Sequence, residues 1–152
     1  LGSAALCLKK IKEGDKPSQI ELNSLNKPIP RLELGSALRN LASSCIDVSD
    51  GLEQDLSHIL RASNVGAIID TNKLPLGDSV NNYVKDTNDW SMPLCGGDDY
   101  ELCFTAGKSK RDKISALAEN LETRVTRIGM INSQKELEVI GFSGMRSSYQ
   151  HF

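Results

Sequence analysis

The chain has 152 residues, a length that suits one domain with a single hydrophobic core better than two full domains. Its 18 basic and 20 acidic residues leave a net charge of −2, so no bulk positive charge favours nucleic acid or an anionic membrane as a partner. No apolar run approaches the roughly 20 residues of a membrane span, and a membrane-spanning helix is therefore not expected.

The cysteine pattern argues against a zinc knuckle, because it contains no C-x-x-C pair and no histidine at zinc-ligand spacing. We expect small buried thiols of a reducing compartment at all four positions, Cys7, Cys45, Cys95 and Cys103. The apolar residues 1–8 are too few for a signal peptide and precede two lysines instead of following them. The chain is therefore expected to be cytoplasmic.

Residues 1–30 begin with a helical pattern and end in a connection that contains two prolines. The apolar positions at helical spacing are Leu1, Ala5, Leu8 and Ile11. Residues 13–17 end this helix, and residues 18–27 carry only a weak pattern for a further short helix. Because the chain opens with Leu instead of Met inside a helical pattern, we interpret residues 1–30 as a linker plus the remnant of an amino-terminal domain.

Residues 31–152 are expected to form one carboxyl-terminal α/β domain, because predicted helices and strands alternate along them. Amphipathic periodicity predicts helices over residues 34–42, 51–62, 79–85 and 114–121. Runs of β-branched and alternating residues predict strands over residues 44–48, 65–70, 100–105, 125–131 and 136–140. Residues 88–93 have no period and are expected to be irregular. The predicted class is α+β, with helices layered on a mixed β-sheet.

The first acidic segment, residues 47–51 (Asp-Val-Ser-Asp-Gly), joins a predicted strand to a predicted helix. Carboxylates at the start of a helix suit hard cations, which commonly accompany phosphates. Asp50 is expected to cap the helix, with Glu53 three residues later as in a capping box. The alternative is purely structural: Asp50 only a cap, Asp47 a solvated charge and Ser49 a turn residue.

The second acidic segment, residues 96–101 (Gly-Gly-Asp-Asp-Tyr-Glu), precedes the next predicted strand. Its two glycines permit either an anion-binding turn or a simple chain reversal. Strand alternation places Glu101 on the less apolar side, away from Tyr100 and Leu102. Each acidic residue alone suits a turn or an exposed strand position, and the roles of Asp98 and Asp99 stay open. Two such segments in one domain favour a shared cavity.

Four runs resemble, in order and spacing, the carboxyl-terminal half of the thiamine-monophosphate kinases. They are Pro28-x-Pro30-Arg31, residues 46–52 (Ile-Asp-Val-Ser-Asp-Gly-Leu), residues 96–105 (Gly-Gly-Asp-Asp-Tyr-Glu-Leu-Cys-Phe-Thr) and Tyr149-x-His151-Phe152. The second acidic segment and the terminal aromatic run are typical of these kinases. The Asp-x-Ser-Asp-Gly run is shared across the aminoimidazole ribonucleotide synthetase-like superfamily. The resemblance implies the fold of that superfamily's carboxyl-terminal domain.

The resemblance also implies an activity, the ATP-dependent phosphorylation of thiamine monophosphate to thiamine diphosphate with Mg²⁺. Carried over by position, Asp47 and Asp50 bind the metal, Ser49 binds ATP, and Glu101 and Tyr149 contact the thiamine substrate. A homodimer through an amino-terminal domain outside this sequence is implied, and the fragment is expected to be inactive alone. Two alternatives stay open: another ATP-dependent synthetase of the superfamily, and a non-catalytic cation-binding module.

Overall fold

The computed structural model describes residues 1–142, so the predicted substrate contact Tyr149 lies outside the described residues. The α-helices are α1 (Ser3–Glu13), α2 (Gln19–Asn26), α3 (Leu32–Ala37), α4 (Leu52–Ser63), α5 (Asp78–Thr87), α6 (Ser91–Cys95) and α7 (Arg111–Asn120). The strands are β1 (Ala42–Asp47), β2 (Gly66–Asp70), β3 (Leu102–Ala106), β4 (Gly129–Asn132) and β5 (Leu137–Ile140). Two short 3₁₀ turns, η1 (Thr71–Lys73) and η2 (Lys108–Lys110), follow β2 and β3.

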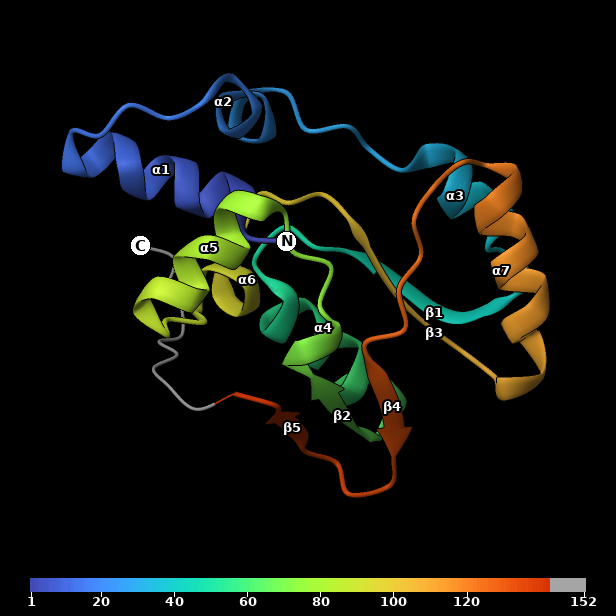
Figure 1. The fold of residues 1–152 in the computed structure, drawn as a ribbon. Coiled ribbons are helices and arrows are strands. Elements are labelled where there is room, and N and C mark those ends of the chain that lie inside the picture. Colours follow the sequence, from blue (N-terminus) through green and yellow to red (C-terminus); the bar gives the residue numbers. More distant parts are fainter. Residues whose placement is uncertain (143–152) are drawn as a thin grey trace.

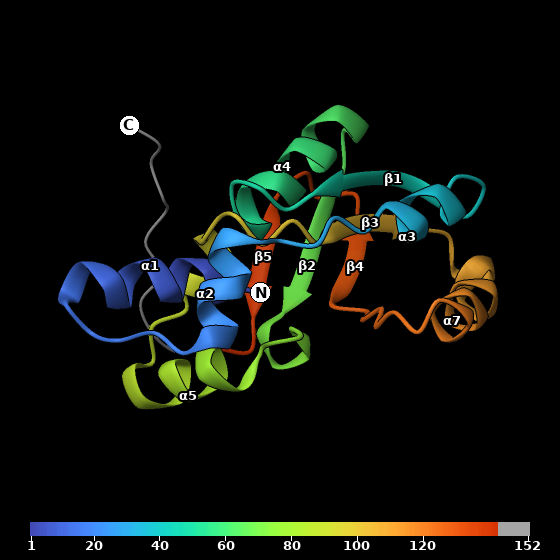
Figure 2. The same cartoon turned by 90° about the horizontal axis from the view of Figure 1, so that it is seen from above.

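The strands form two small sheets. β1 pairs antiparallel with β3, and β2 lies between β4, to which it is antiparallel, and β5, to which it is parallel. Helices α1, α5 and α6 gather at one end of the molecule, while α3 and α7 lie at the other end beside β1 and β3 (Figures 1 and 2). The predicted α+β class with a mixed sheet is confirmed, and the strands are divided between two sheets.

Element boundaries follow the sequence patterns where those patterns are strong. The helix expected over residues 51–62 is α4, the central strand expected over residues 65–70 is β2, and the weak pattern in residues 18–27 is the helix α2. The helix expected to reach residue 42 ends at Ala37, because the chain then turns directly into β1. The prediction that residues 88–93 are irregular was wrong from Ser91 onward, because the short helix α6 begins there.

The main core forms where α4 packs near β1 and α6. Its buried members come from both sheets, from α4 and α6, and from the positions just after β1 and η1: Val48, Leu52, Leu56, Leu60, Ala67, Ile69, Leu74, Leu94, Cys95 and Cys103. Each fully buried Leu or Ile contributes about 1.5–3 kcal/mol relative to an exposed one, so the stripe on α4 fixes the start of that helix against the sheets. No helix among residues 1–142 is long and apolar enough to span a membrane.

Three of the four cysteines are buried, as expected, but Cys45 is exposed. The expectation failed there because exposure alternates along β1 and Cys45 lies on its open face. Burial raises the pKa of the Cys103 thiol to about 11, so this thiol stays protonated and unreactive near neutral pH.

Glu21 is a buried carboxylate that joins α2 to α1. Its Oε1 lies 2.7 Å from Lys10 Nζ, and its Oε2 accepts a 2.7 Å hydrogen bond from Ser18 N in a complete capping box. Burial opposes ionisation, but these hydrogen bonds outweigh it and lower the pKa of Glu21 to about 2. The ionised form is therefore the one that the folded state stabilises.

Glu21→Gln is expected to lower the free energy of unfolding by about 2 kcal/mol near neutral pH. A lowered folded-state pKa contributes stability above the ordinary glutamate pKa and loses it as the pH falls through the folded value. The free energies of unfolding of the variant and the wild type should therefore converge as the pH falls from 4.5, the ordinary pKa, to about 2, the folded-state pKa. Urea unfolding at several pH values measures this difference.

The matched control is Glu13→Gln, which removes an exposed carboxylate that pairs with Lys9 within α1. Exposed ion pairs contribute little, so this control should stay close to the wild type at every pH. A pH-independent difference between Glu21→Gln and the wild type would contradict the role of the charge.

Candidate functional site

The two acidic segments lie directly against each other in the structure. The carbonyl of Ser49 accepts a 2.9 Å hydrogen bond from Asp98 N, and the carbonyl of Val48 accepts a 2.8 Å bond from Tyr100 N. Val48 N in turn donates to the Glu101 carbonyl at 2.8 Å. These backbone bonds hold together two segments that are some fifty positions apart in the sequence. A site shared by the two segments requires this contact.

Two glycines permit this close approach. A Cβ on Gly97 would lie 2.4 Å from the Ser49 carbonyl oxygen, so only glycine fits between the segments. Gly51 has φ +111°, and a Cβ there would lie 2.7 Å from the backbone carbonyl carbon and oxygen of Cys95. The predicted use of glycine for close backbone approach is therefore found in the second acidic segment, and also in the first.

The start of α4 is capped differently from the prediction. Gly51, not Asp50, occupies the N-cap position, and no side chain caps the helix there, so the expected capping box was wrong. Instead the buried carboxylate of Asp55 accepts hydrogen bonds from Ser49 N at 2.9 Å and from Asp50 N at 3.0 Å. The Asp50 carboxylate accepts a 3.2 Å bond from Gln54 Nε2. Asp55 thus fixes the backbone of the first acidic segment.

Sequence reasoning missed Asp55, although one signal was present. Asp55 stands next to Leu56 and three residues after Leu52, so it shares the apolar side of α4 and is 3% exposed. A charged residue on a buried stripe needs partners there. The free backbone N–H groups just before the helix supply them.

Asp99 has a structural role, which the sequence had left open. Its Oδ2 and Oδ1 lie 2.7 and 3.0 Å from Gly2 N, so the carboxylate lies at the start of α1. Burial raises the pKa of Asp99, against the hydrogen bond from Gly2 that favours the charged form. Asp99 therefore ties the second acidic segment to α1.

The second acidic segment has a strained backbone. Asp98 and Tyr100 both have left-handed φ values, +65° and +49°, which non-glycine residues adopt rarely. Tyr100 therefore precedes β3 instead of belonging to it, and the expected strand start was wrong. In β3 the buried side chain is Cys103, while Leu102 is half-buried. The less apolar face of this strand is therefore the one that meets the core.

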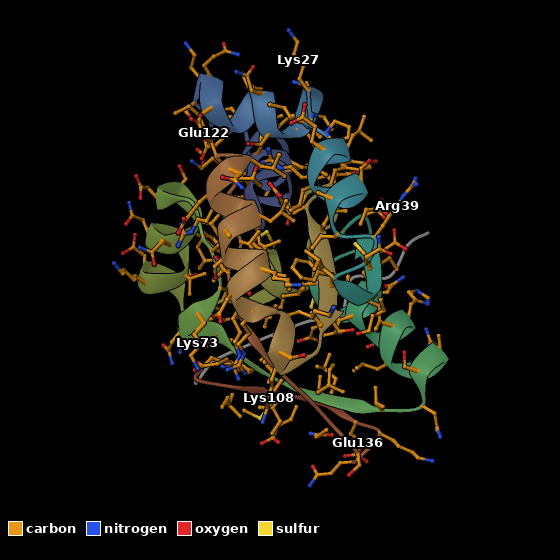
Figure 3. All side chains as sticks on the ribbon, turned by 90° about the vertical axis from the view of Figure 1, so that its right-hand side faces the viewer. Lys27, Arg39, Lys73, Lys108, Glu122 and Glu136 are labelled. Atoms are coloured by element: carbon orange, nitrogen blue, oxygen red, sulfur yellow. The ribbon has the colours of Figure 1, made fainter. Side chains whose placement is uncertain are left out.

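A hollow of about 410 Å³, the first hollow, lies between α3 and the paired strands β1 and β3, beside the open face of β1. It is lined by Pro30, Arg31, Leu32, Gly35, Ser36, Arg39, Asp47, Tyr100 and Leu102. Figure 3 shows Arg39 extending outward beside α3. One predicted metal ligand, Asp47, therefore shares this first hollow with two guanidinium groups and an aromatic ring. Asp50 and Ser49 are not part of its lining.

Glu101 lines a second, larger hollow of about 1200 Å³ that reaches the core and the wall formed by α7. Lys108 and Glu122, which also line it, lie at the two ends of α7 (Figure 3). Arg31 and Leu102 line both hollows. Asp47 and Glu101 thus lie in adjoining hollows instead of one chamber.

The chain supplies hard oxygen ligands for a cation, but not a closed cage. Among residues 1–142, no group of three or more His, Cys, Asp or Glu side chains is placed to hold a metal ion. Mg²⁺ is commonly bound by one or two carboxylates together with water and substrate phosphates. Asp47 and Asp50 fit that mode in number and in ligand type, and their role as metal ligands stays a prediction.

The sequence pattern of one protein family, described as AIR synthase related protein, C-terminal domain, matches residues 1–141. This chain belongs to that family. Thiamine-monophosphate kinase of Escherichia coli (strain K12) is 42% identical to this AIR synthase related domain over 110 residues, which are 72% of the chain and 34% of the kinase. The resemblance to the thiamine-monophosphate kinases is thereby confirmed.

Solved structures agree with this AIR synthase related fold. The crystal structure of thiamine-monophosphate kinase from Stenotrophomonas maltophilia K279a has a TM-score of 0.82 and 37% identity, covering 93% of this chain and 48% of that one. AaThiL complexed with AMPPCP and TMP has a TM-score of 0.77 and 24% identity, and the match covers 100% of this chain and 48% of the AaThiL chain. At that identity the likeness to AaThiL shows the fold alone. The chain spans about a third of the curated relative and about half of each solved chain.

Proposed function

We propose that this chain is the carboxyl-terminal part of a cytoplasmic, ATP-dependent kinase that phosphorylates thiamine monophosphate to thiamine diphosphate. The family match over residues 1–141 and the bonds from Gly2 N to Asp99 support treating this stretch as one carboxyl-terminal domain. The observation that carries the proposal is the direct backbone pairing of the two acidic segments. Both segments carry the motifs shared with the kinases, and their pairing supports assigning them to one site.

On the nucleotide side, Asp47 and Asp50 hold Mg²⁺, and Ser49 contacts ATP. When bound, Mg²⁺ screens the charge of the phosphates during transfer. Phosphoryl transfer requires little covalent chemistry from the protein and depends mainly on positioning and electrostatics. The buried Asp55 carboxylate supports this use, because it holds the amides of Ser49 and Asp50 and so fixes the backbone that carries the ligands.

On the substrate side, Glu101 and Tyr149 contact thiamine monophosphate. A carboxylate is a suitable partner for an amino-bearing ring, and a tyrosine ring can stack on a flat heteroaromatic one. The remaining ligands and the homodimer contact belong to the amino-terminal domain. The isolated chain is therefore expected to be inactive, and the full-length protein that carries it is the object of the assay.

The test is the formation of thiamine diphosphate by the full-length protein from thiamine monophosphate, ATP and Mg²⁺. Product formation that depends on all three components supports the proposal. An absence of product would favour another ATP-dependent synthetase of the superfamily. Equal weak binding of Mg²⁺–nucleotide by the isolated wild-type, Asp47→Asn and Asp50→Asn chains would favour a structural role for the first acidic segment.

Glu101→Ala in the full-length protein is expected to raise the KM for thiamine monophosphate by about 10-fold or more, while the KM for ATP changes much less. The reason is the loss of a charge-assisted hydrogen bond to the substrate ring, which the nucleotide does not make. Steady-state kinetics with each substrate varied in turn measure both constants. A larger rise in the KM for ATP would remove Glu101 from the thiamine site.

A further inference from the structure

We propose that Arg31 is a positioning residue that orients the Glu101 carboxylate toward the substrate, an inference that rests on the proposed function. Arg31 Nη2 lies 2.7 Å from Glu101 Oε1, and Arg31 Nε lies 3.0 Å from Glu101 Oε2. The two residues are 70 positions apart in the sequence. Two parallel N–H···O bonds fix the plane of a carboxylate, which a single bond does not.

Both partners are anchored through their backbones. Arg31 follows the proline-containing connection, and its carbonyl accepts a 2.9 Å hydrogen bond from Gly35 N at the start of α3. The Glu101 carbonyl accepts a 2.8 Å bond from Val48 N in the first acidic segment. The stiff connection and the paired segments thus set the distance between the side chains before any ligand binds.

The exposure of the pair argues against a purely structural role. The side chains of Arg31 and Glu101 are 35% and 43% exposed, and ion pairs in contact with solvent contribute little to stability. The pair also lies at the boundary between the two hollows, because Arg31 lines both and Glu101 lines the second. Its main consequence is therefore the direction of the Glu101 carboxylate within the site.

The bidentate contact leaves Glu101 able to bind a ligand. Each carboxylate oxygen has two lone pairs, and Arg31 uses one on each oxygen. The remaining lone pairs then point away from Arg31 in fixed directions and are available to an N–H donor on a flat ring. Lysine cannot reproduce this orientation, because its ammonium group is a point charge without the planar fork.

The experiment compares Arg31→Ala, Arg31→Lys and Arg39→Ala in the full-length protein. Arg39 lines the first hollow but is not bonded to Glu101, so Arg39→Ala controls for the loss of a nearby positive charge. We expect both Arg31 variants to raise the KM for thiamine monophosphate by about 10-fold and to leave the KM for ATP within about 2-fold. Their urea unfolding midpoints and those of Arg39→Ala should stay near that of the wild type.

A double variant makes the test specific to the pair. If Arg31 acts through Glu101, then Arg31→Ala combined with Glu101→Ala should be no worse than Glu101→Ala alone. Additive effects, or an equal rise of both KM values in Arg31→Ala, would overturn the role of Arg31 while the kinase assignment stands. A wild-type protein that forms no thiamine diphosphate would overturn the proposed function and this inference with it.

Discussion

Gly51→Ala is expected to lower the free energy of unfolding by about 4 kcal/mol, the sum of backbone strain and a steric overlap. The backbone angles of Gly51, φ 111° and ψ 148°, lie in a region that is essentially restricted to glycine. A Cβ would also lie 2.7 Å from the carbonyl carbon and oxygen of Cys95, which are main-chain atoms in α6 and cannot move aside cheaply. Urea unfolding of the variant and the wild type measures the difference.

Two other glycines separate the causes. Gly14 has φ +83° with no atom within 4 Å of its would-be Cβ, so Gly14→Ala tests the dihedral cost alone, about 1 kcal/mol. In Gly97→Ala the overlap with the Ser49 carbonyl dominates, because its φ is not in the left-handed region. The expected order of destabilisation is Gly51, then Gly97, then Gly14. Equal decreases in the free energy of unfolding for Gly51→Ala and Gly14→Ala would mean that the backbone of Cys95 moves aside at little cost, and the steric part of this prediction would be wrong.

The contact of the two acidic segments was predictable in outline from the sequence. Each segment stands at the edge of a strong periodic pattern, and strand ends that meet on one side of a sheet bring their loops together. The register could not be predicted. It depends on which residue of β3 faces which residue of β1, and the observed pairing of Asp47 with Leu102 is fixed by packing over the whole strand pair.

The cap of α4 shows why a local motif can mislead. The spacing of Asp50 and Glu53 satisfies the capping-box pattern, but the pattern assumes that Asp50 immediately precedes the helix in an extended conformation. Gly51 takes that position with a backbone conformation that other residues avoid, and the Asp50 amide that a capping box would pair with Glu53 bonds to Asp55 instead. That choice depends on the close approach of Cys95, which no local pattern encodes.

The sequence left open which face of β3 meets the core. Each face of β3 carries at least one apolar side chain, Leu102 and Phe104 on one and Cys103 on the other, so composition alone does not show which face meets the core. Helix α4 covers the face that carries Cys103, and the other face, with Leu102 and the preceding Tyr100, opens on the first hollow. Arg31 escaped sequence analysis as a contact of Glu101 for a different reason, since the two residues are 70 positions apart and only the fold brings them together.

Asp47→Asn in the full-length protein is expected to lower kcat for thiamine diphosphate formation by about 100-fold or more, a loss typical of removing one group that stabilises charge in the transition state. Asp47 is exposed, and its pairing with Leu102 uses only the backbone, so the fold should be retained. The amide keeps the shape of the side chain but removes the negative charge that attracts a divalent cation. Product formation at saturating substrates, measured across a range of Mg²⁺ concentrations, gives both the rate and the metal dependence.

Glu138→Gln is the matched control, because Glu138 is also an exposed carboxylate on a short strand but lies on β5, in the other sheet. It should keep nearly the wild-type rate. If Asp47 holds the cation, the loss in Asp47→Asn should shrink as Mg²⁺ increases, since mass action partly compensates for a weakened site. A rate within about 2-fold of the wild type at low Mg²⁺ would mean that Asp47 is not a ligand. The first acidic segment would then contribute to the site only through Ser49 and Asp50.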